Sequence, residues 1–92
     1  MERDSKQLEQ MTAHLTSAQL TTAYNAPEWT IAQNIHHVAD SHMNAFLRFK
    51  WAVTEDNPTI KTYHLDNWAR QPDAINPDIV HSLAILHGLH AR

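Results

Sequence analysis

Hydrophobic residues recur every three or four positions in three stretches of the chain, at about residues 5–15, 31–53 and 77–92. This spacing is typical of amphipathic α-helices. Residues 54–76, between the second and third stretches, show no clear period and contain two prolines, which predicts a loop. Ninety-two residues make at most one small domain. The pattern therefore predicts an all-α fold, a single domain over residues 1–92 built as an antiparallel helical bundle.

The middle stretch opens with the strongest local signal in the chain. Thr30-x-x-Gln33 fits the capping box, in which each side chain accepts the backbone N–H of the other residue. No glycine or proline occurs between Pro27 and Pro58, so the helix is expected to run to about residue 53 with a length of about 34 Å. Its expected apolar stripe comprises Ile31, Ile35, Val38, His42, Phe46, Phe49 and Val53.

The outer helices are shorter. Asn76-Pro77-Asp78 predicts a helix start, with asparagine as N-cap and proline in the first turn. The apolar stripes are expected at Leu8, Met11 and Leu15 in the first helix and at Ile79, Leu83, Leu86 and His90 in the last. Single helical turns are expected at residues 17–20 and 66–70, and packing anchors at Tyr24, Ile60, Tyr63 and Trp68. Because the last helix has no C-cap signal, a partial domain is expected.

Histidine is over-represented, with eight residues in the chain. On a helix His37 points about 140° away from His42, so the two cannot share a metal ion, whereas Asp40 lies within about 60° of His37. The apolar face of the helix alone does not decide whether His37 or His42 is functional. His87-x-x-His90 has a spacing that can place two imidazoles on one ion. The remaining histidines that we assign to the surface are His14, His64 and His81.

Composition narrows the possible partners. A net charge of −3 without a Lys/Arg cluster argues against binding to nucleic acid or an anionic membrane surface. No apolar run approaches the roughly 20 residues of a membrane span, and the N-terminus lacks the apolar core of a signal peptide, so a cytoplasmic protein is expected. Without cysteine, any metal must be held by nitrogen and oxygen. No phosphate-binding glycine loop or activated nucleophile is evident.

One run of residues resembles a known family. Trp29-Thr30-x-x-Gln33-x-x-His36-His37-x-x-Asp40-Ser41-His42, continuing to Lys50, is similar to the YfiT-like branch of the DinB-like superfamily. Trp68-Ala69 and the final run Leu86-His87-x-Leu89-His90-Ala91-Arg92 extend the similarity over nearly the whole chain. The resemblance implies three helices of a four-helix bundle, and the activity of a metal-dependent hydrolase.

The resemblance also implies a site. Members of the family hold zinc or nickel with three histidines, and the ligand on the second helix corresponds to His37. The other two, an H-x-x-x-H pair on the last helix, have no counterpart here, so an incomplete site is expected. His36 and Asp40 are candidates to support the ligand from the second shell, and His87 and His90 are alternative ligands, including a site built from His37 of one chain and His87 and His90 of another.

Two other functions stay open. Some DinB-like relatives resemble thiol-dependent S-transferases, whose thiolate would take the open metal position. The chain would otherwise be a non-catalytic helical fragment or interaction module that forms a homo-oligomer, such as a dimer, through its exposed apolar seam.

Overall fold

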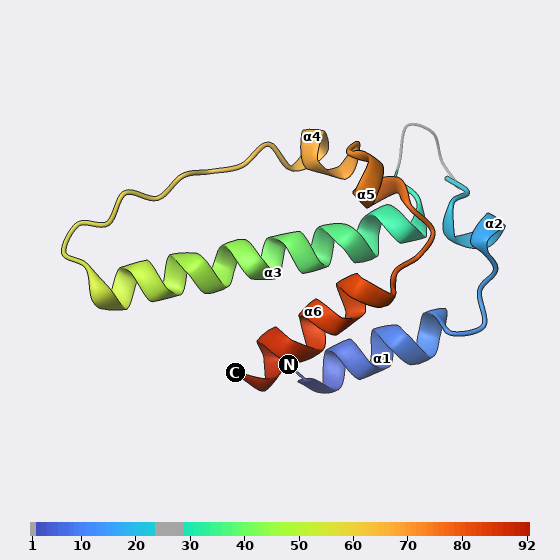
Figure 1. Cartoon of the computed structure of the whole chain (residues 1–92), viewed down its shortest axis with the longest axis horizontal. Coiled ribbons are helices and arrows are strands. Elements are labelled where there is room, and N and C mark those ends of the chain that lie inside the picture. Colours follow the sequence, from blue (N-terminus) through green and yellow to red (C-terminus); the bar gives the residue numbers. More distant parts are fainter. Residues whose placement is uncertain (1, 24–28) are drawn as a thin grey trace.

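Helix α3 (Ile31–Thr54) is the longest described helix and runs along the long axis of the molecule (Figure 1). The computed structural model describes residues 2–23 and 29–92, and every regular element among them is a helix. The others are α1 (Glu2–Thr12), α2 (Ser17–Leu20), α4 (Leu65–Ala69), α5 (Pro72–Ile75) and α6 (Val80–Ala91). The predicted all-α fold is confirmed, as are the single helical turns near residues 17–20 and 66–70.

The capping box predicted at the start of α3 is present. The Gln33 N–H donates to Thr30 Oγ1 at 3.0 Å, and the Thr30 N–H donates to Gln33 Oε1 at 2.9 Å. The other end of α3 is set by a turn in which Asn57 adopts a φ of 52°, a left-handed conformation that asparagine tolerates better than most residues. Pro58 follows and cannot continue a helix. Both predicted ends of this helix are therefore confirmed to within a residue.

The cap makes a testable contribution to stability. Thr30→Ala removes an acceptor from the first turn of α3, and we expect it to lower the free energy of unfolding by about 1 kcal/mol. Thr59→Ala is a matched control, because Thr59 is exposed and outside any helix, and it should change stability by less than about 0.5 kcal/mol. Urea denaturation followed by circular dichroism measures both. Equal effects would contradict a stabilising cap.

The connection after α3 determines how the helices are arranged. Residues 55–64 run back along α3 and lead into α4 and α5, so that α6 begins beside the first turns of α3 and runs in the same direction (Figure 1). Helix α1 runs opposite to α6. The parallel direction of α3 and α6 was not part of the expected antiparallel arrangement. It arises because a 25-residue return path, residues 55–79, covers most of the length of α3 before the next long helix begins.

The core lies where α1, α2, α3 and α6 meet. Leu20, Ala32, Ile35, Ile79 and Leu83 are buried there, and Leu8, Leu15 and Ile31 pack against them. Leu86 is fully buried and is the largest such side chain among the described residues. The apolar stripe predicted for the last helix is thereby confirmed. Met11 was expected in the core but is 67% exposed, because α1 turns its Leu8 side toward the cluster.

The far half of α3 extends beyond the C-terminal end of α6 (Figure 1). Phe49 and Val53, predicted to be buried, are 64% and 62% exposed, and Leu47 on the same half of the helix is also exposed. Of the predicted stripe of α3 only Ile35 is buried, and Ile31, Val38, His42 and Phe46 are half-buried. Exposed apolar side chains in this number are unusual on an isolated domain, and association of two copies through them stays a prediction.

Three further predictions, about two helices and the anchors of the loop, differ from the structure. The last helix begins at Val80 and not at residue 77, because Asn76 ends α5 and its side chain accepts the Asp78 N–H in a local turn at 2.7 Å. The first helix is shifted about three residues toward the N-terminus. Ile60 and Trp68 were expected to anchor the loop but are both 41% exposed, although Trp68 contacts the Tyr63 ring. Tyr24 lies outside the described residues.

None of the described helices is both long enough and apolar enough to span a bilayer.

Candidate metal-binding site

The histidine doublet of α3 is divided between the interior and the surface. Because successive residues of a helix are about 100° apart, His36 and His37 face different neighbours. His36 is 7% exposed and points toward α6, whereas His37 is half-buried. The two imidazoles therefore have different chemical surroundings.

Both ring nitrogens of His36 are occupied by protein partners. Nε2 lies 2.8 Å from the carbonyl oxygen of Asn76, and Nδ1 lies 2.6 Å from Ser82 Oγ. A carbonyl oxygen only accepts, so Nε2 carries the proton and Nδ1 accepts from the Ser82 hydroxyl. The predicted role of His36 in support of a metal ligand stays a prediction. The geometry assigns His36 a structural role, because its hydrogen bonds connect α3 to Asn76 and to Ser82 near the start of α6.

His37 makes no such bonds to the described residues. Its ring meets the edge of the Trp29 ring at a centroid distance of 5.0 Å and an angle of 66°. Within the described part of the chain neither of its ring nitrogens has a hydrogen-bond partner. A half-buried imidazole with free nitrogens is suited to bind a metal ion, for which it must present an unprotonated nitrogen.

Asp40 lies one turn after His37 on α3 and is also half-buried. Its burial raises the pKa of this carboxyl, and the nearby Asp73 carboxylate raises it further, while His36 and His37 lower it. Asp40 is thus close enough to both histidines to interact with them electrostatically. A carboxylate in this position can orient a metal-binding imidazole.

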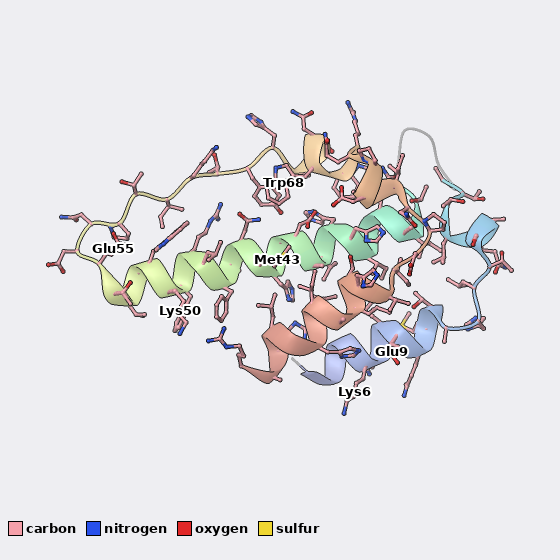
Figure 2. The ribbon with its side chains drawn as sticks, viewed as in Figure 1. Lys6, Glu9, Met43, Lys50, Glu55 and Trp68 are labelled. Atoms are coloured by element: carbon pink, nitrogen blue, oxygen red, sulfur yellow. The ribbon has the colours of Figure 1, made fainter. Side chains whose placement is uncertain are left out.

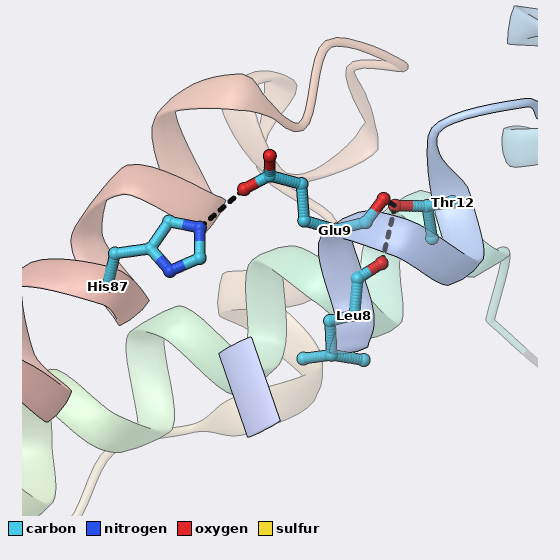
Figure 3. Close-up of polar contacts among 4 residues, drawn as sticks. All are labelled: Leu8, Glu9, Thr12 and His87. Atoms are coloured by element: carbon cyan, nitrogen blue, oxygen red, sulfur yellow. Dashed lines mark hydrogen bonds and ion pairs between the residues drawn. The ribbon is translucent and has the colours of Figure 1, made fainter. Parts of the chain in front are cut away.

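His87 and His90 of α6 make different contacts. His87 Nε2 lies 2.6 Å from Glu9 Oε2 of α1, next to the turn in which the Thr12 hydroxyl donates to the Leu8 carbonyl (Figure 3). His90 Nε2 instead lies 2.8 Å from His42 Nδ1 of α3. The helical spacing of His87 and His90 therefore does not bring the two imidazoles to one point within the described chain. Their use as ligands in a site shared between chains stays a prediction.

The described residues do not make a complete metal site. Among them there is no group of three histidine, aspartate or glutamate side chains arranged to hold an ion. His37 fits the role of one imidazole ligand, and Asp40 that of a supporting carboxylate. The incomplete three-histidine site stays a prediction.

The pairing of His42 with His90 and that of His36 with Ser82 were not foreseen. Both His42 and His90 had been placed on apolar stripes of their helices, and facing positions on two packed stripes are a signal for contact. This signal can be used only when the relative direction of α3 and α6 is known. The return path along α3 determines that direction. Ser82 gave no signal, since a serine on a helix is most often a surface residue.

His42 should make stability depend on pH. Its pKa is lowered, first by burial and second by the neighbouring His90, so the unfolded chain binds the proton more readily than the folded one. Protonation of His42 therefore destabilises the folded state. This loss is absent above the unfolded pKa of about 6.5, and it grows as the pH is lowered from there through the folded pKa. Urea denaturation between about pH 8 and pH 5 should show a smaller loss for His42→Asn than for the wild type. An unchanged pH dependence would contradict this.

Comparison with known proteins places these residues in a family context. The family model of the DinB superfamily matches residues 1–92. A Geobacillus kaustophilus protein with the name "Putative metal-dependent hydrolase" is 53% identical over 78 residues, which cover 85% of this chain and 44% of that protein. A Geobacillus thermodenitrificans protein of the same name is 50% identical over 80 residues, covering 87% of this chain and 45% of that protein. A Bacillus cereus relative is 51% identical over 78 residues.

A solved structure shows the same fold. The chain is similar to YfiT from Bacillus subtilis with a TM-score of 0.92 and 41% identity, over 99% of this chain and 52% of the other. YfiT is described as "a probable metal-dependent hydrolase with an unusual four-helix bundle topology". The chain thus spans about half the length of the relatives it matches.

Proposed function

The chain belongs to the DinB superfamily, and on that premise we propose that it is part of a metal-dependent hydrolase, in which His37 is one ligand of a divalent zinc or nickel ion. The names of the relatives support the metal and the reaction class. The remaining ligands would come from outside residues 2–23 and 29–92.

The observation that carries the proposal is the free imidazole of His37. His36, His42, His87 and His90 each have a ring nitrogen within 2.8 Å of a described protein atom. His37 is the one candidate ligand of α3 and α6 whose nitrogens have no such partner in the described chain. Binding of an ion at His37 breaks no hydrogen bond to the described residues, whereas binding at His36 would break the link to Ser82 or Asn76.

The neighbours of His37 suit this role. The Trp29 ring, just before the start of α3, contacts the imidazole and limits the directions in which it can turn. Asp40 can accept a hydrogen bond from the imidazole and so fix its tautomer and raise its basicity as a ligand. A metal ion bound there would supply Lewis acidity for the attack of water on an ester or amide.

Chelation and restoration of the metal test the proposal. The protein, purified at the length its gene encodes, is assayed against a panel of simple esters and amides, before and after removal of metal ions and again after addition of zinc or nickel. We expect hydrolysis to be lost and then restored in the wild type, and not restored in His37→Ala. Hydrolysis that survives complete metal removal would overturn the proposal. Transfer of the acyl or alkyl group to an added thiol without hydrolysis would assign the site to a thiol-dependent transferase instead.

A further inference from the structure

His42 of α3 and His90 of α6 bring two imidazole nitrogens together between their helices. Nδ1 of His42 lies 2.8 Å from Nε2 of His90, with 4.9 Å between the ring centroids and an angle of 44° between the rings. Met43, the residue after His42, marks this level of α3 in Figure 2. His42 points about 140° away from His37 around α3, so the pair is separate from the candidate site at His37.

The hydrogen bond of this pair leaves the tautomers of both rings free. Nδ1 of His90 is buried without a hydrogen-bond partner among the described residues, and Nε2 of His42 has no partner among them either. The hydrogen bond of the second ring nitrogen usually decides which nitrogen of an imidazole binds a metal ion. His36 shows the opposite case, because both of its nitrogens are bonded. Each ring of the pair can therefore present an unprotonated nitrogen where the two rings meet.

The protonation state of the pair also suits a metal ion, which requires unprotonated imidazole nitrogens. Burial lowers the pKa of His42, and the neighbouring His90 lowers it further, which favours a neutral ring near pH 7. When both meeting nitrogens are unprotonated, the two protons of a neutral pair lie on Nε2 of His42 and Nδ1 of His90. Two lone pairs then face each other, and a cation between them removes their repulsion.

The separation of the two nitrogens indicates which ions fit. Imidazole nitrogens lie about 2.0–2.1 Å from a divalent transition metal. Two nitrogens that are 2.8 Å apart therefore make an angle of about 85° at the ion. This is close to the angle between neighbouring ligands in the tetragonal geometry of Cu²⁺ and Ni²⁺, whereas tetrahedral Zn²⁺ needs about 3.3 Å between its ligand atoms.

We propose that His42 and His90 bind a divalent copper or nickel ion between α3 and α6, through Nδ1 of His42 and Nε2 of His90. The ion replaces the hydrogen bond between the rings as the link between the two helices. Binding moves one proton within a single ring and leaves both rings neutral, so no other group has to gain or lose a proton. The proposal does not depend on a metal ion at His37.

Two features make this site weaker than a site with three histidines. The pair supplies two ligands, and water takes the remaining positions. The Arg92 guanidinium and Lys50 Nζ lie 4.9 Å and 5.5 Å from the centroid of the Phe46 ring, one turn after His42, and their charge opposes a cation. Figure 2 shows Lys50 further along α3 than Met43. We therefore expect the site to fill when metal is added to the purified protein.

Titration with Cu²⁺ tests the proposal, in the protein at the length its gene encodes and with His37→Ala to remove the other candidate ligand. We expect a saturable site and a melting temperature that rises with the Cu²⁺ concentration, because an ion bound only to the folded pair stabilises the fold. His42→Asn and His90→Asn, each added to His37→Ala, should abolish both effects. His81→Asn, at an exposed histidine of α6, should leave both unchanged.

A measurement without these variants covers the case in which His42→Asn or His90→Asn prevents folding. Substoichiometric Cu²⁺, which is paramagnetic, should broaden the imidazole resonances of His42 and His90 in the His37→Ala protein before those of exposed histidines such as His81. Broadening that begins elsewhere and spares this pair would overturn the proposal. The same holds if no saturable site forms at micromolar Cu²⁺, or if folded His42→Asn and His90→Asn variants keep the site.

Discussion

His36→Ala is expected to lower the free energy of unfolding by about 3 kcal/mol, while His37→Ala, one residue further, should change it by less than about 1 kcal/mol. His36 is 7% exposed, and its loss leaves the Ser82 hydroxyl and the Asn76 carbonyl without their partner, in addition to an unfilled space between α3 and α6. A buried polar group left unsatisfied costs about 1–3 kcal/mol. His37 has no hydrogen bond to the described chain that its removal would break.

Urea denaturation of the two variants measures this difference. Ser82→Ala provides an independent test of the same bond, because it removes only the hydroxyl, and we expect a loss of about 1–2 kcal/mol from it. His81→Ala serves as the control on α6, since His81 is exposed. If His36→Ala and His37→Ala destabilised the fold equally, the structural role assigned to His36 would be wrong.

Leu86→Ala is expected to lower the free energy of unfolding by about 3 kcal/mol, within the usual range for a buried leucine. Leu86 has 0% of its surface exposed, and it lies on α6, the helix that packs against both α1 and α3. Truncation removes the apolar contacts of a fully buried side chain and leaves a cavity. Because a domain of this size buries a limited core, a loss of this magnitude would leave little stability.

The neighbouring residue offers a matched control. Ile85 is 36% exposed, and Ile85→Ala should cost less than about 1 kcal/mol. Leu86→Met retains most of the volume and should cost less than about 1.5 kcal/mol, so it provides a folded variant if the alanine substitution prevents folding. Thermal and urea denaturation measure the series. Similar losses for Ile85→Ala and Leu86→Ala would show that α6 does not bury the face described above.

The sequence predicted best those features that depend on neighbouring residues in the chain. Thr30 and Gln33 start α3, and both belong to the same helical turn, so their capping box is visible in the sequence. Asn76 appeared to be an equally good cap, yet it ends α5 and turns its carbonyl to His36. That contact joins residues 40 positions apart, and a local pattern contains no information about it.

Features that depend on the packing of distant segments were not predictable. Periodicity placed Phe49 and Val53 on a buried stripe, but both are exposed in the described structure. The pattern of α3 also did not distinguish His36 from His37. His36 is the buried one of the two because it bonds Ser82 of α6. The direction of the return path along α3 brings Ser82 to this position. The resemblance to a family selected His37, and the free nitrogens of its ring are consistent with that selection.

The most direct test of His37 as a metal ligand is the metal content of the purified protein, at the length its gene encodes, measured by mass spectrometry of the elements. We expect about one divalent ion for each wild-type chain, a loss of most of that ion in His37→Ala, and full retention in His14→Ala, where an exposed histidine is removed instead. A wild-type protein without bound metal, or a His37→Ala variant that keeps its ion, would contradict the proposed site.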